Sequence, residues 1–140
     1  MGLLNVRAWH ISAALLCTQY SAVPIVLKLI SKEFRLLINT RVNREWTATD
    51  YSGIERSLFR NNDAGGRSSV VRLIAGARFP RHAHHGNEEV VVLSGIVLIG
   101  GVELSQSDYL FTQAGEEHDV VAVSDAVIFV SSQKSTPIVE

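Results

Sequence analysis

From Leu36 to the end of the chain, short segments rich in valine, isoleucine and phenylalanine alternate with clusters of glycine, asparagine, aspartate and serine. The segments include RSSVVRLIA, EEVVVLSGIVLIG and AVIFVSS, and the clusters include NNDAGG, HGN and SQSD. Short β-prone segments at regular spacing, separated by turn residues, are typical of β-sandwiches and β-barrels. No stretch of this region keeps a helical apolar period for three turns. We therefore predict an all-β fold, with LLINTRV at residues 36–42 as its first strand.

The segment EEVVVLS at residues 88–94 has apolar residues on both faces of the predicted strand. Side chains alternate along a strand, so Glu88, Val90 and Val92 share one face and Val91 lies on the other. A strand with two apolar faces is expected to be covered on both sides. A second sheet would cover one face. A homodimer partner or the N-terminal segment would cover the other.

Residues 1–35 differ in texture from the rest of the chain, because they are apolar, poor in glycine and interrupted by Pro24. A transmembrane helix needs roughly 20 predominantly apolar residues, and polar residues break this run. Three interpretations remain open: short helices broken near Pro24, an export signal, or sequence outside the native fold. We predict a helical or poorly ordered, non-native extension at 1–35 and one domain at 36–140.

Charge and cysteine content narrow the function classes. The chain has 140 residues and a net charge of −1, so no basic field indicates a nucleic acid or a membrane surface as partner. Cys17 is the only cysteine, which excludes an intramolecular disulfide and a disulfide-rich secreted scaffold. We expect a cytoplasmic protein.

Three histidines and two glutamates fall within the ten residues PRHAHHGNEE. On an extended strand His82 and His84 point to one face, about 6.6–6.8 Å apart along the chain, while His85 points to the other. A Gly-Asn turn then returns the chain and brings Glu88 toward the first face. His118 opens another strand after a glycine-containing turn. Imidazole and carboxylate groups suit divalent zinc, iron, manganese, nickel or copper, so His82, His84, Glu88 and His118 are candidate metal ligands. The alternative is a solvated His-x-His strand without metal.

The same stretch resembles the cupin superfamily. From Gly76 to Gly95 the chain reads G-x5-H-x-H-x3-E-x6-G, the first cupin motif, at every specified position. The second motif, G-x5-P-x-G-x2-H-x3-N, is met in part, at Gly115 and His118. Its other three positions hold Ser107, Gln113 and Ala122. These departures affect turn geometry and not the candidate ligand.

Residues 37–135 are similar to the cupin domain of ChrR-type anti-sigma factors and its stand-alone relatives. This resemblance implies a small RmlC-like jelly-roll β-barrel. It also implies that zinc is bound at the positions of His82, His84, Glu88 and His118. ChrR-type proteins carry a separate zinc-binding anti-sigma domain with closely spaced cysteines. This chain has one cysteine, so we do not predict sigma-factor binding.

Three functional hypotheses follow. The first is a metal-binding cupin with a sensory or ligand-binding role and a small molecule in its barrel. The second is a metal-dependent enzyme of the dioxygenase or isomerase type, and the third is a cupin scaffold with an empty site. We assign no catalytic residue. Tyr109 and Phe111 are expected to pack the barrel, with a substrate-lining role as the alternative. Arg78 and Arg81 are expected to lie at solvent-facing strand ends or to meet an anionic ligand.

Overall fold

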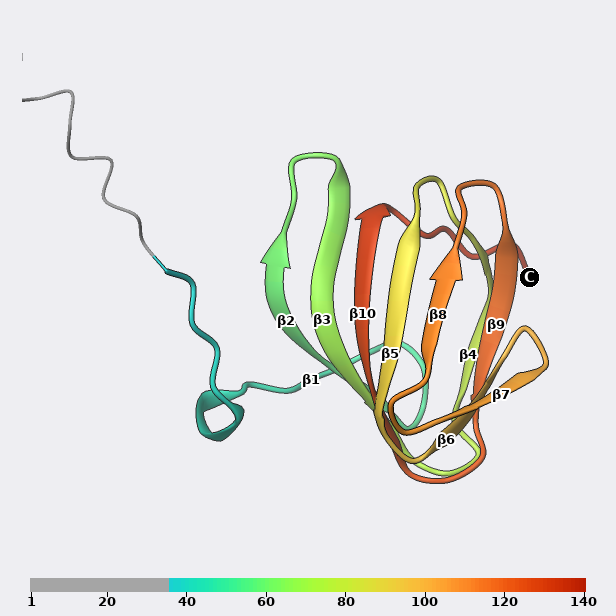
Figure 1. Ribbon diagram of the computed structural model, residues 1–140, viewed down its shortest axis with the longest axis horizontal. Coiled ribbons are helices and arrows are strands. Elements are labelled where there is room, and N and C mark those ends of the chain that lie inside the picture. Colours follow the sequence, from blue (N-terminus) through green and yellow to red (C-terminus); the bar gives the residue numbers. More distant parts are fainter. Residues whose placement is uncertain (1–35) are drawn as a thin grey trace, which may run out of the picture. The chain divides into compact units, whose positions relative to one another are not determined.

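The computed structural model describes residues 36–140, and the predicted extension at 1–35 lies outside them. In this part of the chain the strands form two antiparallel sheets (Figure 1). The six-stranded sheet has the order β1 (Thr47–Ala48), β2 (Ile54–Asn61), β3 (Gly65–Leu73), β10 (Ala126–Lys134), β5 (Glu88–Ser94) and β8 (Tyr109–Thr112). The four-stranded sheet has the order β4 (Arg78–Ala83), β9 (Glu117–Ala122), β6 (Ile96–Ile99) and β7 (Val102–Ser105). The predicted all-β fold is confirmed.

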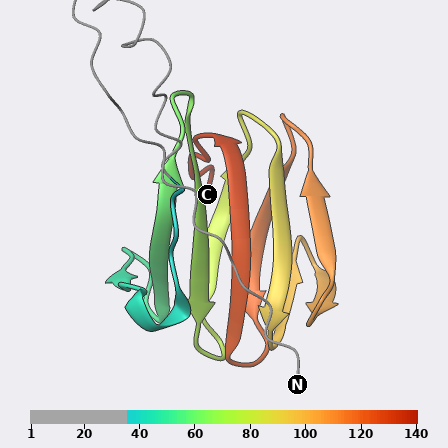
Figure 2. The same ribbon diagram turned by 60° about the vertical axis from the view of Figure 1, so that its left-hand side comes forward.

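The strand order differs from the chain order, which is how distant segments meet. β10 lies between β3 and β5, and β9 lies between β4 and β6. Figure 2 shows the long strands of the larger sheet side by side, with β10 in red between β3 in green and β5 in yellow. The C-terminal strands therefore join strands from the first half of the described chain in both sheets.

The inner face of the larger sheet changes character along its length. Val71 pairs with Ile128 on β10, and Ile128 pairs with Val92 on β5, so this level of the sheet is apolar. Toward the other end of the strands, Arg67, Ser132 and Glu88 stand opposite one another across β3, β10 and β5. We call these three residues the polar rung. The apolar end supplies much of the core, and the polar rung places charged groups at one end of the interior.

The segment EEVVVLSGIVLIG is divided at Gly95 between the two sheets. β5 belongs to the larger sheet and β6 to the smaller one. Gly95 has a φ of 80°, and a Cβ there would lie 2.1 Å from the backbone oxygen of Asp125. Glycine at this motif position thus meets two constraints, the left-handed backbone and the close approach of the facing turn.

Two predictions of local structure were wrong. Residues 36–42 form no strand. Within the described residues the nearest element is a 3-10 helix, η2 (Arg41–Asn43), and the apolar side chains of Leu37 and Val42 are 70% and 89% exposed. Tyr109 and Phe111 do not pack the interior but lie on the outer face, 56% and 44% exposed. Alternation along β8 turns their neighbours inward instead.

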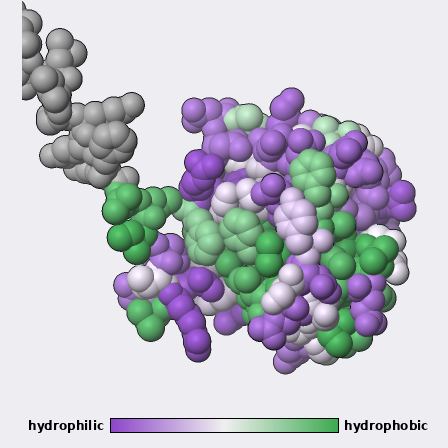
Figure 3. Space-filling model, in the orientation of Figure 1, coloured by the Kyte–Doolittle hydropathy of each residue, from purple (hydrophilic) through white to green (hydrophobic). Residues whose placement is uncertain are grey.

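The outer face of the larger sheet remains partly apolar. Leu93 is also exposed there, and Phe59 stacks on Phe129 at a centroid distance of 6.4 Å. The space-filling view shows apolar surface in the middle of the visible face, bordered by hydrophilic side chains (Figure 3). The predicted homodimer stays a prediction. Within residues 36–140, no helix has the length and apolar character that a membrane crossing requires.

Candidate metal centre

The four predicted ligands meet at one point inside the sandwich. His82 lies on β4, His84 follows that strand, Glu88 begins β5, and His118 lies on β9. One nitrogen or oxygen from each residue lies within 4.8 Å of those of the others, and all four residues are buried. His85, which was expected to point away, is exposed.

Strand pairing accounts for this convergence. His82 and His118 are direct partners in the antiparallel pairing of β4 with β9, and their ring centroids are 4.6 Å apart. His84 is tied to the turn before β9, because its backbone N–H donates to the Glu116 carbonyl at 3.0 Å. The turn at Gly86 and Asn87 then leads into β5 and delivers Glu88 to the same interior.

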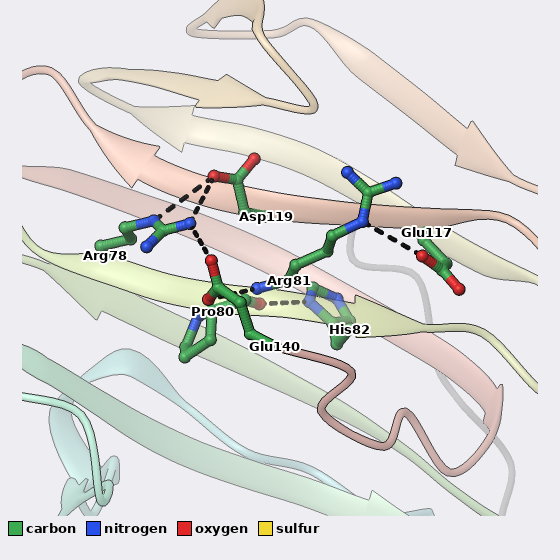
Figure 4. Close-up of polar contacts among 7 residues, drawn as sticks. All are labelled: Arg78, Pro80, Arg81, His82, Glu117, Asp119 and Glu140. Atoms are coloured by element: carbon green, nitrogen blue, oxygen red, sulfur yellow. Dashed lines mark hydrogen bonds and ion pairs between the residues drawn. The ribbon is translucent and has the colours of Figure 1, made fainter.

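Backbone carbonyls orient two of the three imidazoles. Nδ1 of His82 lies 2.9 Å from the Pro80 carbonyl oxygen, as Figure 4 shows, and Nδ1 of His84 lies 3.1 Å from the Glu116 carbonyl oxygen. A carbonyl oxygen only accepts, so both Nδ1 atoms carry a proton, and the Nε2 atom of His84 faces the cluster beside Glu88. Metal-binding histidines commonly use such partners on the other ring nitrogen.

Ser132 holds the carboxylate and was not found from the sequence. Its Oγ donates to Oε2 of Glu88 at 2.5 Å, while Oε1 lies 3.1 Å from His84 Nε2 and 3.8 Å from His118 Nε2. Ser132 is 9% exposed. The available signal was its place two residues after Val130, as the polar member of the inward-facing series on β10.

The surroundings shift the pKa values of the cluster in different directions. Burial lowers the pKa of His82. Burial, and then the neighbouring imidazoles, lower the pKa of His118 to about 4. Burial also acts to lower the pKa of His84, but hydrogen bonding and charge from Glu88 outweigh it, so this pKa is raised. Burial acts to raise the pKa of Glu88, but hydrogen bonds from His84 and Ser132 outweigh it and leave the pKa lowered. At neutral pH, His82, His118 and Glu88 are therefore in the forms that bind cations.

An internal cavity adjoins the cluster. About 60 Å³ of it is accessible to the centre of a water molecule, and His82, Glu88 and His118 form part of its wall. Much of the remaining wall is apolar and includes Ile54, Val71, Leu73 and Ile128. Arg56, Arg67, Ser69 and Thr136 also line it. The two arginines were not found from the sequence.

The C-terminal segment pairs with β4, the edge strand of the smaller sheet. The Ala83 N–H donates to the Pro137 carbonyl at 2.9 Å, and the Val139 N–H donates to the Arg81 carbonyl at 3.0 Å. Glu140 forms an ion pair with Arg78, and its carboxylate also accepts from the Arg81 N–H at 3.1 Å (Figure 4). These contacts fix the strand that carries His82.

Arg78 and Arg81 point to solvent and pair with acidic residues of this chain. Arg78 contacts Asp119 at 3.3 Å, and Arg81 Nε donates to Glu117 at 3.1 Å. Their side chains are 51% and 57% exposed. They lie at solvent-facing strand positions, one of the two predicted alternatives.

The comparisons with known proteins agree with this architecture. The model of the ChrR cupin-like domain family matches residues 35–136. The DNA damage-repair/toleration protein DRT102 of Arabidopsis thaliana is 31% identical over 96 residues, which cover 64% of this chain and 30% of that protein. The chain thus spans less than a third of the length of this curated relative.

Two solved structures show the same fold at low identity. A candidate acetylacetone dioxygenase from Methylibium petroleiphilum PM1 is 15% identical with a TM-score of 0.71, over 80% of this chain and 86% of that one. The polyketide cyclase RemF from Streptomyces resistomycificus is 14% identical with a TM-score of 0.62, over 76% and 87% of the two chains. At these identities the likeness concerns the fold alone.

Proposed function

The chain belongs to the ChrR cupin-like domain family, and on that premise we propose that His82, His84, Glu88 and His118 bind one divalent metal ion. The observation that carries this proposal is the meeting of four buried donor groups within 4.8 Å. Two of the imidazoles have their Nδ1 protons engaged by backbone carbonyls, so their Nε2 atoms are available. Without a cation, this arrangement would leave three imidazole rings crowded against one carboxylate.

We propose zinc as the ion, with iron, manganese and nickel as alternatives. Three imidazoles and one carboxylate complete a tetrahedral zinc site, which is a structural arrangement. The same donors leave two positions open on a six-coordinate ion. A bound divalent ion supplies Lewis acidity to a group placed beside it. The chain's own contribution is to orient the imidazoles through Pro80 and Glu116, and the carboxylate through Ser132.

A ligand-binding or sensory role is supported by the cavity beside the cluster. Its wall contains three of the four proposed ligands together with apolar side chains from the larger sheet. Small-molecule sites are typically concave and largely apolar, with a few placed polar groups. A molecule in this cavity would contact both the metal and the apolar core, so its binding would affect residues of both sheets.

The second candidate is a metal-dependent enzyme of the dioxygenase type. The same cavity favours it, because the structure gives a substrate-sized group a position next to the cluster. The fold likeness to a candidate dioxygenase is consistent with this alternative. The two candidates differ in coordination, because catalysis needs an open position on the ion and a structural site does not. No residue of the chain is assigned as a catalytic acid or base.

Elemental analysis of protein purified without a histidine tag tests the metal site. We expect close to one divalent ion per chain in the native protein, and none in a His82→Ala, His84→Ala double variant. His85→Ala is the matched control, because His85 is adjacent in sequence but exposed on the opposite face. Circular dichroism checks that each variant folds. Metal content that survives in a folded double variant would contradict the assignment.

Chelation gives an independent readout. A ligand that binds only the folded state stabilises it, so removing the metal should lower the melting temperature of the native protein. The double variant should not respond to the chelator. A native protein whose melting temperature is unchanged by chelation would instead support the empty scaffold.

A further inference from the structure

Two arginines, Arg56 and Arg67, line the cavity that adjoins the His/Glu cluster. Arg67 belongs to the polar rung, where it stands opposite Ser132 on β10. Arg56 lies on β2 opposite Val71 of β3, and both residues line the cavity. Both arginines therefore border the same cavity as Glu88.

Arg56 and Arg67 differ from the three arginines that form ion pairs at the surface. Arg72, Arg78 and Arg81 each pair with an acidic side chain at the surface. Among residues 36–140, neither Arg56 nor Arg67 forms an ion pair or a side-chain hydrogen bond, and Nε of Arg56 is buried without a hydrogen-bond partner. Burial, and then the charge of Arg67, lower the pKa of Arg56, so the two positive charges oppose each other.

The charges in the cavity wall do not balance. Glu88 is the acidic residue in that wall, and its carboxylate is already engaged by Ser132 and His84. Two guanidinium charges and one carboxylate leave an excess of one positive charge. A divalent cation bound by the cluster would raise that excess. Arg56 and Arg67 are half-buried. Charged groups that lose part of their hydration are stabilised by a partner of opposite charge, so the cavity favours an anion.

We propose that Arg56 and Arg67 form an anion-binding wall, and that the ligand of this cavity is a small organic carboxylate. This inference rests on the proposed metal site and names the class of molecule that would lie beside it. The planar guanidinium group matches a carboxylate through paired N–H donors. The apolar residues Ile54 and Leu73 supply the surface for the ligand's hydrocarbon part.

The cavity limits the size of the ligand, and a second depression shares Arg67 and Ser132 with it. At about 10–15 Å³ for each water position, 60 Å³ corresponds to roughly four to six water-sized positions, which suits a carboxylate with a short chain or one ring. Arg67 and Ser132 also line this second depression, together with Arg60, Asn62 and Gln133. The positive groups there would attract an anion toward the cavity.

Calorimetric titration with matched acids and amides tests the proposal. Metal-loaded native protein is titrated with propionate, butyrate and benzoate, with the corresponding uncharged amides, and with inorganic phosphate. We expect at least one carboxylate to bind about tenfold or more tightly than its own amide, because only the acid forms charge-assisted hydrogen bonds. Phosphate is expected to bind more weakly than that carboxylate. Failure of all three acids, equal binding of acid and amide, or preference for phosphate would overturn the proposal.

Variants assign the binding to the arginines. Arg56→Gln and Arg67→Gln should each weaken the carboxylate about tenfold or more and leave amide binding unchanged, which closes the gap between acid and amide. Arg72→Gln is the control, since Arg72 lies on β3 with its side chain exposed and paired with Glu55. Carboxylate affinity that survives both substitutions in folded protein would refute the arginine wall.

Metal content distinguishes failure of this proposal from failure of the metal-site proposal on which it rests. Elemental analysis should find the same metal in the native protein and in both glutamine variants, because neither arginine is a proposed ligand. If the native protein carries no metal, the metal assignment fails, and the titrations are repeated on that metal-free protein. A carboxylate that still binds through Arg56 and Arg67 would then support the anion wall alone, and no binding would reject both.

Discussion

Replacing Ser132 with alanine should weaken metal binding without removing any proposed ligand. The Ser132 hydroxyl donates to Oε2 of Glu88 at 2.5 Å, and both residues are buried. A hydrogen bond to a charged group contributes about 1.5–3 kcal/mol. Since every 1.4 kcal/mol is a factor of about ten, we expect the metal dissociation constant of Ser132→Ala to rise roughly 10- to 100-fold.

Two effects act in the same direction in this variant. The carboxylate loses the contact that fixes its orientation toward His84 and His118. It also loses a donor that lowers the pKa of Glu88, so burial can raise that pKa and protons compete better with the metal. Loss of such an outer contact typically costs 10- to 100-fold in metal affinity, in line with the range worked from the hydrogen bond.

Competition with a chromophoric chelator at pH 7 measures the affinity. Ser131→Ala is the matched control: Ser131 is the neighbouring residue on β10, and its hydroxyl lies 3.2 Å from that of Ser68, away from the cluster. We expect Ser131→Ala to keep native affinity. Equal affinities for Ser132→Ala and Ser131→Ala would refute the reasoning, since Glu88 would then need no support from β10.

Three further predictions concern backbone strain and protons. Ser107 has a φ of 76°, which is a strained conformation for a residue with a side chain. Ser107→Gly should therefore raise the free energy of unfolding, measured by urea titration, by about 0.5–1 kcal/mol. A lower stability of this variant would contradict the strain. Gly76 and Gly95 have similar φ values, but only at Gly95 would a Cβ meet other atoms, at 2.1 Å. Gly95→Ala should therefore lower the free energy of unfolding clearly more than Gly76→Ala does. Equal losses in the two variants would contradict the clash. Burial lowers the pKa of His84 less than its hydrogen-bonded carboxylate raises it, whereas the pKa of His118 is lowered to about 4. Metal binding near pH 6.5 should thus release a proton from His84, and affinity should fall as pH drops through that range. Calorimetry in buffers of different ionisation enthalpy that finds no proton release would contradict this.

The His/Glu cluster was predictable from the sequence because its geometry is mostly local. Strand alternation alone places His82 and His84 on one face and His85 on the other, and a two-residue turn returns Glu88. His118 is the exception, since its position depends on the pairing of β9 with β4. Spacing alone could not establish that pairing. The partial match to the second motif identified His118 as a candidate.

The errors arose where the outcome depended on neighbours that local patterns do not reveal. LLINTRV has the composition of a strand, but the described part of the chain provides no strand to pair with residues 36–42. Tyr109 and Phe111 were correctly placed on one face of β8, yet that face is the outer one. Alternation determines which residues share a face, and only the packing of the two sheets determines which face is buried.

The two arginines that we propose bind the ligand show the same limit of local sequence patterns. Alternation puts Arg67 and Arg72 on opposite faces of β3, but nothing in RSSVVRL shows which of the two faces lines the cavity. The distinction depends on the register of β3 with β10 and of β10 with β5, which aligns Arg67, Ser132 and Glu88 across segments 21 and 44 residues apart in sequence. Metal ligands in a cupin can therefore be identified by motif, whereas the groups that select a ligand follow from strand register. Among chains that share the four-ligand motif, we expect ligand preference to vary with the residues of the polar rung and its neighbours, because those positions change the charge of the cavity without changing the ligands.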